Sequence, residues 1–163
     1  MKGLQRLFSR KAARSHSDDA VTHPLGRSPQ FSVDVQLSDA AREKLIDCKE
    51  TIIVVGCFIG HPKESTEARF LDKAGQVFLG EVRREIRHGE IAKFEQLNLN
   101  PDALAQTDSQ GPIVFIDVFS GRRSSKDNLL DCEDYEGCFE SVLGRTMVLH
   151  CQLIDERFPR SGR

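Results

Sequence analysis

The sequence predicts an all-β domain, a β-sandwich of about seven strands with Greek-key, immunoglobulin-like connections and one or two short helices. Three observations support this. Several short segments alternate apolar and polar residues, others are continuous β-branched runs, and turn residues recur between them. Long helical patterns between the strands are missing, which argues against a parallel doubly wound fold. The 163 residues suffice for one such domain, expected at 31–156.

The predicted domain begins with a strand over 31–37, where apolar and polar residues alternate. Ser38 then occupies a helix N-cap position, and Asp39 follows in the first turn, where a negative charge suits the helix dipole. Apolar residues spaced by four and three predict a short helix over 39–48. The run 51–59 is continuously apolar and β-branched, which predicts a central strand buried on both faces.

The rest of the domain is expected to consist mainly of further strands. Residues 72–75 read as a hairpin turn, and Arg87, His88 and Gly89 as a second turn. Asn100, followed by a proline and an aspartate, predicts a short helix over 101–106. The expected strands are, in chain order, 66–70, 77–86, 90–96, 113–119 and 146–154.

Residues 1–30 form a basic arm that is distinct from the predicted domain. The arm contains six basic and two acidic residues, which leaves the rest of the chain acidic. Four of its basic residues recur at every fourth position and would line one face of a helix: Lys2, Arg6, Arg10 and Arg14. Three interpretations stay open, namely a passive tail, an organelle-targeting segment, or peripheral membrane contact through residues 1–17. Residues 157–163 are expected to form a short basic tail.

The composition argues against several classes of protein. No apolar run approaches the roughly 20 residues that span a bilayer, and the apolar core of a secretory signal is absent. The default expectation is therefore a cytoplasmic protein, or one at an organelle or membrane surface if the arm is functional. A net charge of -2 argues against nucleic-acid partners. Known nucleotide-binding and catalytic motifs are missing, so we assign no cofactor and no catalytic residue.

The best candidate for a contact surface is the loop over 120–126. It concentrates three basic side chains, several hydroxyls and a glycine on an otherwise acidic domain, and such a loop can bind a phosphate or an acidic partner. The alternative is a solvated loop that binds no ligand or partner. The residues expected to make contact are Arg122, Arg123, Ser124 and Lys126. The predicted function is accordingly a non-enzymatic binding or protein-interaction module for an unknown protein or anionic ligand.

Five cysteines leave at least one thiol free or paired with another chain. Cys132 and Cys151 are the pair most expected to form a disulfide. Cys151 falls on the buried side of the last predicted strand. Cys132 follows Leu129 and Leu130, the only apolar pair in a long polar connection, so this segment is expected to be held against the sheet. Free thiols are the alternative in a reducing compartment. A zinc site that adds Cys138 and His150 to this pair is disfavoured, since adjacent strand residues point to opposite faces, and we assign no metal.

The alternative function is a metal- or thiol-dependent enzyme that uses Asp117, His150 and the C-terminal cysteines. Asp117 motivates this hypothesis because it lies within an otherwise apolar strand, where an unpaired carboxylate is costly. It is expected either to face the open side of the sheet or to pair with a base such as Arg122, Arg123 or His150. A structural role for Asp117 is the simpler of these interpretations.

Overall fold

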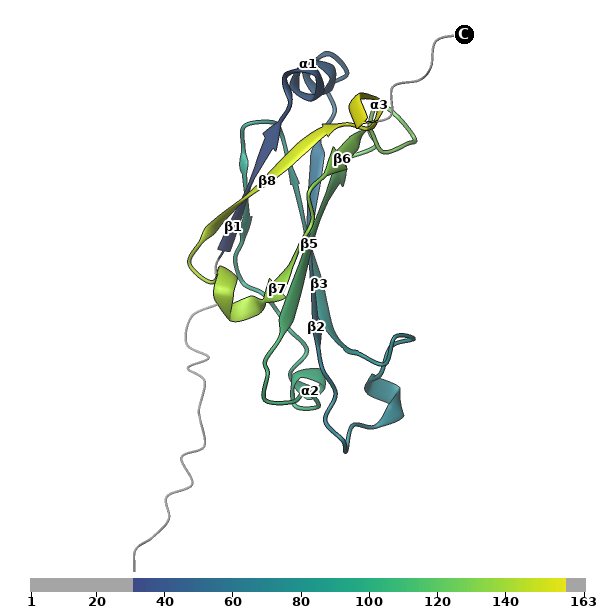
Figure 1. The fold of residues 1–163 in the computed structure, drawn as a ribbon, viewed down its shortest axis with the longest axis vertical. Coiled ribbons are helices and arrows are strands. Elements are labelled where there is room, and N and C mark those ends of the chain that lie inside the picture. The colour runs from purple at the N-terminus through teal and green to yellow at the C-terminus, as the bar shows by residue number, and fades with distance from the viewer. Residues whose placement is uncertain (1–30, 158–163) are drawn as a thin grey trace, which may run out of the picture.

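The computed structural model describes residues 31–157, which form two packed four-stranded sheets (Figure 1). Sheet A has the strand order β4-β1-β8-β6, and sheet B has the order β3-β2-β5-β7. The strands are β1 (Phe31–Leu37), β2 (Ile52–Gly60), β3 (Val77–Ile86), β4 (Ile91–Phe94), β5 (Ile113–Ser120), β6 (Leu130–Cys132), β7 (Tyr135–Cys138) and β8 (Thr146–Leu153). The helices are α1 (Asp39–Asp47), α2 (Pro101–Leu104) and α3 (Ile154–Arg157), with 3₁₀ turns η1 (Ala68–Phe70) and η2 (Phe139–Val142).

The short helices lie at the two ends of the sandwich. In Figure 1, α1 and α3 lie at the upper end and α2 at the lower end. Within 31–157, no helix has the length and apolar character needed to cross a membrane. The predictions for the basic arm over 1–30 fall outside the described residues, as do those for the C-terminal tail beyond Arg157.

The first and last strands lie side by side in sheet A. β1 pairs in parallel with β8, from Ser32 opposite Thr146 to Leu37 opposite Cys151, and antiparallel with β4. In sheet B, β2 lies between β3 and β5 and pairs antiparallel with both. The chain passes from sheet B to sheet A at the turn between β3 and β4, so this turn joins the two layers rather than closing a hairpin.

An aromatic cluster fills the space between the sheets where β1 begins. The rings of Phe31 and Phe94 are stacked with centroids 4.5 Å apart, and Phe58 and Phe139 pack against this pair edge-on. Gly56 makes room for the stack, since a Cβ there would lie 3.2 Å from the Phe94 ring. These rings anchor β1 and β4 of sheet A to β2 of sheet B, because offset aromatic pairs add to the free energy gained by burial.

Most of the predicted elements are confirmed. The strand at 31–37 has the expected bounds, and the helix after it begins at Asp39 as expected but ends at Asp47, one residue before the predicted end. The Ser38 hydroxyl caps α1 by accepting from the Ala41 amide at 3.1 Å. The Asn100 side chain caps α2 in the same way by accepting from the amides of Asp102 and Ala103. Local signals suffice here because a cap is an interaction between residues two or three positions apart.

Three predictions of secondary structure are wrong. Residues 66–70 do not form a strand: η1 occupies their second half, and β3 pairs with β2 instead. The described residues contain eight strands rather than seven, because β6 and β7 are short and polar. Their ladder partners, β8 and β5, are distant in sequence, so the local pattern of these segments carries little signal. The last strand also ends before Ile154, where α3 begins.

The prediction that β2 is buried on both faces also needs correction. β2 is central in sheet B, and its inward residues, among them Ile52, Val54 and Phe58, are fully buried. Its opposite face lies on the outside of the sandwich, where Val55 and Cys57 are only half-buried. The run is continuous because both faces of β2 are apolar, although only one of them packs against the other sheet.

Candidate functional site

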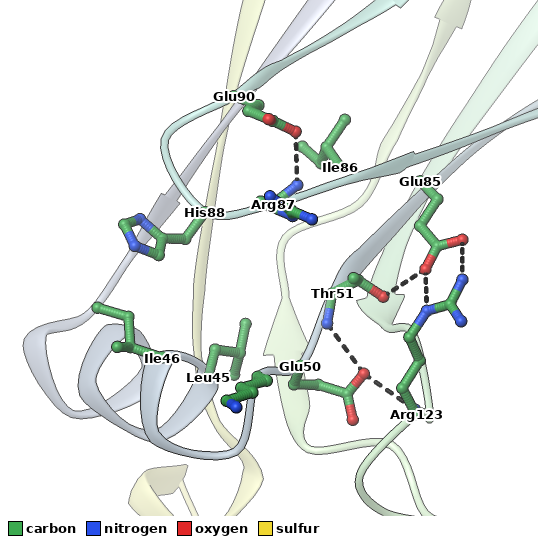
Figure 2. Close-up of a pocket in the computed structure, with 11 residues that line it drawn as sticks. Leu45, Ile46, Glu50, Thr51, Glu85, Ile86, Arg87, His88, Glu90 and Arg123 are labelled. Carbon is green, nitrogen blue, oxygen red and sulfur yellow. Dashed lines mark hydrogen bonds and ion pairs between the residues drawn. The ribbon is translucent and has the colours of Figure 1, made fainter.

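The candidate site is a pocket of about 710 Å³ at the α1 end of the sandwich. Figure 2 shows it between the end of α1, the turn from β3 to β4, and Arg123 of the loop that follows β5. These three segments are far apart in the sequence. Its volume falls in the range that small-molecule sites occupy in proteins, roughly 300–1,000 Å³.

The end of α1 directs the chain into this site through a Schellman motif. The Glu50 amide donates to the Leu45 carbonyl at 2.8 Å, and the Lys49 amide donates to the Ile46 carbonyl at 3.0 Å. Lys49 therefore adopts a left-handed conformation with a φ of 52°. The chain therefore leaves the helix axis at Lys49, and Glu50 lies directly before β2.

The carboxylate of Glu50 is the centre of the neighbouring loop, although Glu50 is only 5% exposed. One oxygen accepts from the amides of Thr51 and Arg123, both at 3.0 Å. The other accepts from the Ser124 amide at 2.8 Å and the Ser124 hydroxyl at 2.6 Å. The loop after β5 is thus folded around an anion, and that anion belongs to the chain itself.

The hydrogen bonds determine the charge state of Glu50. Burial by itself would raise the pKa of this carboxyl group. The hydroxyl of Ser124 and the amides of Arg123, Ser124 and Thr51 outweigh burial, because all of them stabilise the ionised form, and they lower the pKa to about 2. Glu50 is therefore a structural carboxylate that stays ionised at neutral pH.

A second carboxylate, Glu85 of β3, holds the Arg123 side chain. The Arg123 guanidinium contacts both oxygens of Glu85, with Nη2 at 2.7 Å from Oε2, and the Thr51 hydroxyl donates to Oε1 at 2.7 Å. Hydrogen bonds from Arg123 and Thr51 lower the pKa of Glu85 to about 2. These contacts appear as dashed lines on the right of Figure 2.

Gly121 lets the loop approach the start of β2. Its amide donates to the Thr51 carbonyl at 2.8 Å, and a Cβ at this position would overlap the Thr51 hydroxyl. A larger residue at this position would therefore have to displace the Thr51 side chain. The approach in turn brings the amides of Arg123 and Ser124 within reach of Glu50.

The remaining cations of the pocket have no such partners. Among residues 31–157, the side chains of Lys49, Arg87 and His88 form no hydrogen bond or ion pair. The pocket's other carboxylate, Glu90, accepts from the Arg87 amide at 2.8 Å. The apolar lining of the pocket comes from Leu45, Ile46 and Ile86, of which Ile46 is 49% exposed. The cationic side chains of Lys49 and Arg87 and the imidazole of His88 therefore surround an apolar floor.

The structure divides the predicted contact residues into two groups. Arg123 and Ser124 are bound internally by Glu85 and Glu50. Arg122 and Lys126 are exposed, and neither lines the pocket. The anion-binding chemistry expected of this loop is therefore present, but its amides and its best-placed cation act on carboxylates of the same chain.

Asp117 and His150 do not lie in one site. Asp117 faces outward from β5 in sheet B, and His150 faces outward from β8 in sheet A, so the whole sandwich separates them. His150 Nδ1 instead lies 3.0 Å from a Glu133 oxygen. Asp117 thus faces the open side of its sheet, the first of the two expected arrangements. Within 31–157, no group of three or more His, Cys, Asp or Glu side chains is placed to hold a metal ion.

Cys132 and Cys151 are directly opposite each other on β6 and β8, with their sulfurs at disulfide distance, 2.12 Å. This is the pair singled out by the sequence. Cys48, Cys57 and Cys138 remain free thiols. Burial, with a smaller contribution from Glu81 and Asp72, raises the pKa of the Cys57 thiol, so it is the protonated form that the fold favours there.

The pocket itself was not predicted. The sequence predicts a turn at Arg87 and His88 and assigns no role to Lys49 and Glu50, which lie between the predicted helix and the predicted strand. Two features of the sequence accompany these segments: the helix ends without a glycine, and the turn at Arg87 and His88 is rich in charged residues. Neither feature indicates that the two segments meet in the fold. Neither a protein-family model, nor a curated protein, nor a solved structure matches this chain.

Proposed function

We propose that this domain is a non-enzymatic binding module whose ligand is an organic anion, a carboxylate or phosphate joined to an apolar group. The ligand would lie in the pocket between α1 and the β3–β4 turn. One observation carries the proposal: Lys49, Arg87 and His88 have no partner among the described side chains, whereas every carboxylate of the pocket accepts a hydrogen bond.

The apolar floor supports an amphiphilic ligand rather than a simple inorganic anion. Ile46 exposes half of its surface beside the fully buried Leu45. Covering such a residue is favourable by about 25 cal/mol per Å² of apolar surface removed from water. A ligand with an apolar group would gain this energy in addition to its contacts with Lys49, Arg87 and the His88 imidazole.

The loop over 120–126 has a supporting role in this proposal. Arg123 and Ser124 hold the loop against Glu85 and Glu50, and this places Arg123 in the wall of the pocket. The exposed Arg122 and Lys126 lie outside the pocket and take no part in the proposed binding. The enzyme hypothesis is less favoured, because Asp117 and His150 face outward from different sheets.

We retain the Greek-key, immunoglobulin-like connectivity as part of the proposal. In its favour, β2, β3 and β4 follow one another along the chain and β1 pairs with β4. The parallel pair of β1 and β8 is a further element of this arrangement. The fold would then serve as a rigid support for loops that carry the binding groups.

Titration of the full chain with sodium decanoate, followed by amide NMR spectra, tests the proposal. We expect shifts for Lys49, Arg87 and His88, and weaker binding of inorganic phosphate, which lacks an apolar group. Lys49→Gly and Arg87→Gln should each weaken decanoate binding about fivefold, the equivalent of about 1 kcal/mol. Lys126→Gln is the matched control, since it removes a loop cation outside the pocket.

Three results would contradict the proposal. Decanoate binding that is unchanged in both pocket variants would show that the ligand lies elsewhere. Loss of binding in Lys126→Gln alone would move the site to the exposed part of the loop. Phosphate binding as tight as that of decanoate would remove the role of the apolar floor.

A further inference from the structure

Side chains of both charges line the pocket between α1 and the β3–β4 turn. Three of the lining side chains are cationic, namely those of Lys49, Arg87 and Arg123. Three others are carboxylates, namely those of Glu50, Glu85 and Glu90. The formal charges of the lining therefore cancel, and the His88 imidazole can donate a hydrogen bond without being charged.

The three cations differ in what they can offer to a ligand. The Arg123 guanidinium contacts both oxygens of Glu85, with Nη2 at 2.7 Å from Oε2. Among residues 31–157, the side chains of Lys49 and Arg87 form no hydrogen bond or ion pair. Two cations are therefore available to a ligand, and they match the two oxygens of one carboxylate.

The carboxylates limit the charge that a ligand can carry in this pocket. Glu85 is ionised at neutral pH, because hydrogen bonds from Arg123 and Thr51 lower its pKa to about 2. Arg87 follows Glu85 by two residues, which is roughly 7 Å in an extended chain and within the screening length of physiological salt. Glu90 belongs to the same turn, where its carboxylate accepts from the Arg87 amide at 2.8 Å (Figure 2).

We propose that the pocket selects a monoanion, a carboxylate with an apolar chain rather than a phosphate monoester, and that Glu85 and Glu90 determine this selectivity. This inference rests on the proposed function and names the ligand class within it. A phosphate monoester carries close to two negative charges at neutral pH. Its second charge would be repelled by the carboxylates of the lining about as strongly as the cations attract it.

Desolvation adds to this selectivity. A group with two charges costs more to remove from water than a group with one, and the cost is recovered only where opposite charges face it. Lys49 and Arg87 face a single carboxylate with one charge to spare, and Glu90 lies beside them. A dianion in the same place would lose more hydration without gaining a further partner, because Arg123 already has Glu85.

Decanoate and decyl phosphate test the selectivity, because the two compounds share one apolar chain and differ in charge. Calorimetric titration of the full chain should show that decyl phosphate binds no more tightly than decanoate. Glu85→Gln and Glu90→Gln each remove one negative charge from the lining and keep a hydrogen-bond acceptor. Each should improve the binding of decyl phosphate relative to decanoate about fivefold, the effect expected of one unit charge across a partly solvated pocket.

Glu81→Gln is the matched control. Glu81 is an exposed carboxylate on the same strand, β3, and it does not line the pocket. The control should leave the ratio of the two dissociation constants unchanged, and thermal unfolding checks that each variant folds.

The outcomes distinguish this inference from the proposed function. Wild-type protein that binds decanoate, with the same ratio of dissociation constants in both pocket variants, would overturn the selectivity alone. So would wild-type protein that binds decyl phosphate several-fold more tightly than decanoate, or a control that shifts the ratio as much as the pocket variants do. If neither compound binds, the proposed function fails and this inference fails with it.

Discussion

The Glu50 carboxylate lies 2.8 Å from the Ser124 amide nitrogen and 2.6 Å from the Ser124 hydroxyl oxygen, and so joins the start of β2 to a loop 74 residues further along the chain. The contact links three parts of the molecule: the end of α1, the central strand of sheet B and the loop after β5. It also occupies the donors that the loop would otherwise offer to an external anion. The stability of the pocket wall therefore depends on Glu50.

Glu50→Ala should lower the free energy of unfolding by about 3 kcal/mol at neutral pH. The value is the cost of leaving buried donors unpaired, about 1–3 kcal/mol, because the carboxylate accepts hydrogen bonds from the amides of Thr51, Arg123 and Ser124 and from the Ser124 hydroxyl. Urea unfolding followed by circular dichroism measures it. Glu43→Ala on the exposed side of α1 is the control and should change stability by less than about 0.5 kcal/mol. A change equally small for Glu50→Ala would show that water replaces the carboxylate at no cost.

The stability of the domain should depend on pH in the acid range. Because the folded-state pKa of Glu50 is depressed, its contribution is fully present above the unfolded value of 4.5 and is lost as the pH falls towards about 2. The pKa of Glu85 is lowered in the same direction. Unfolding midpoints measured across this window should fall for the wild type and fall less steeply for Glu50→Gln. Parallel curves for the two proteins would assign the acid sensitivity to other carboxylates.

The pair Cys132 and Cys151 should be bonded in protein purified without reductant. Alkylation followed by mass spectrometry should then label three thiols, those of Cys48, Cys57 and Cys138. Reduction, or Cys151→Ser, should lower the free energy of unfolding by about 3 kcal/mol, as expected for a loop closed over a separation of 19 residues. Labelling of all five cysteines would leave the pair as packed thiols.

Lys49→Gly should stabilise the domain while it weakens ligand binding. Lys49 has a φ of 52°, a conformation that costs a residue with a side chain about 1 kcal/mol and that glycine adopts freely. Thermal unfolding measures the gain. Lys44→Gly, within α1, removes an equal charge but should destabilise by about 1 kcal/mol, since glycine is unfavourable inside a helix. A loss of stability in Lys49→Gly would mean that the lysine side chain contributes more than its backbone costs.

The local elements of the fold could be predicted because their causes are close together in sequence. Ser38 caps α1 through an amide three residues away, and the alternation over 31–37 follows from a strand with one buried face. The segments β6 and β7 could not be predicted, because they are strands only by virtue of their ladders with β8 and β5. Residues 66–70 show the reverse case, since their alternating pattern finds no partner strand.

The candidate site was predictable only in its chemistry. The sequence predicts that the loop over 120–126 contacts an external phosphate or acidic partner, and this stays a prediction; in the structure, the Arg123 and Ser124 amides of the loop bind a carboxylate of the same chain. That the carboxylate is Glu50 depends on Gly121 passing close to Thr51, a contact between segments 70 residues apart. The free cations of the pocket, Lys49 and Arg87, come from two further segments whose meeting no local pattern encodes.

By itself the sequence determined that the domain is built of strands, where its first strands and its capped helices begin, and which cysteines are placed to pair. These properties depend on the periodicity of apolar residues, on helix caps and on turn residues, and each of these involves only a few neighbouring residues. Only the tertiary structure decided that the outward face of β2 is buried at Ile53 and Ile59 but only half-buried at Val55 and Cys57, that Asp117 and Arg83 lie on either side of Val55, and that the Glu50 carboxylate binds the basic loop. Each of these depends on the register and packing of segments far apart in the chain, where many pairings satisfy the same local pattern and only the complete core selects one.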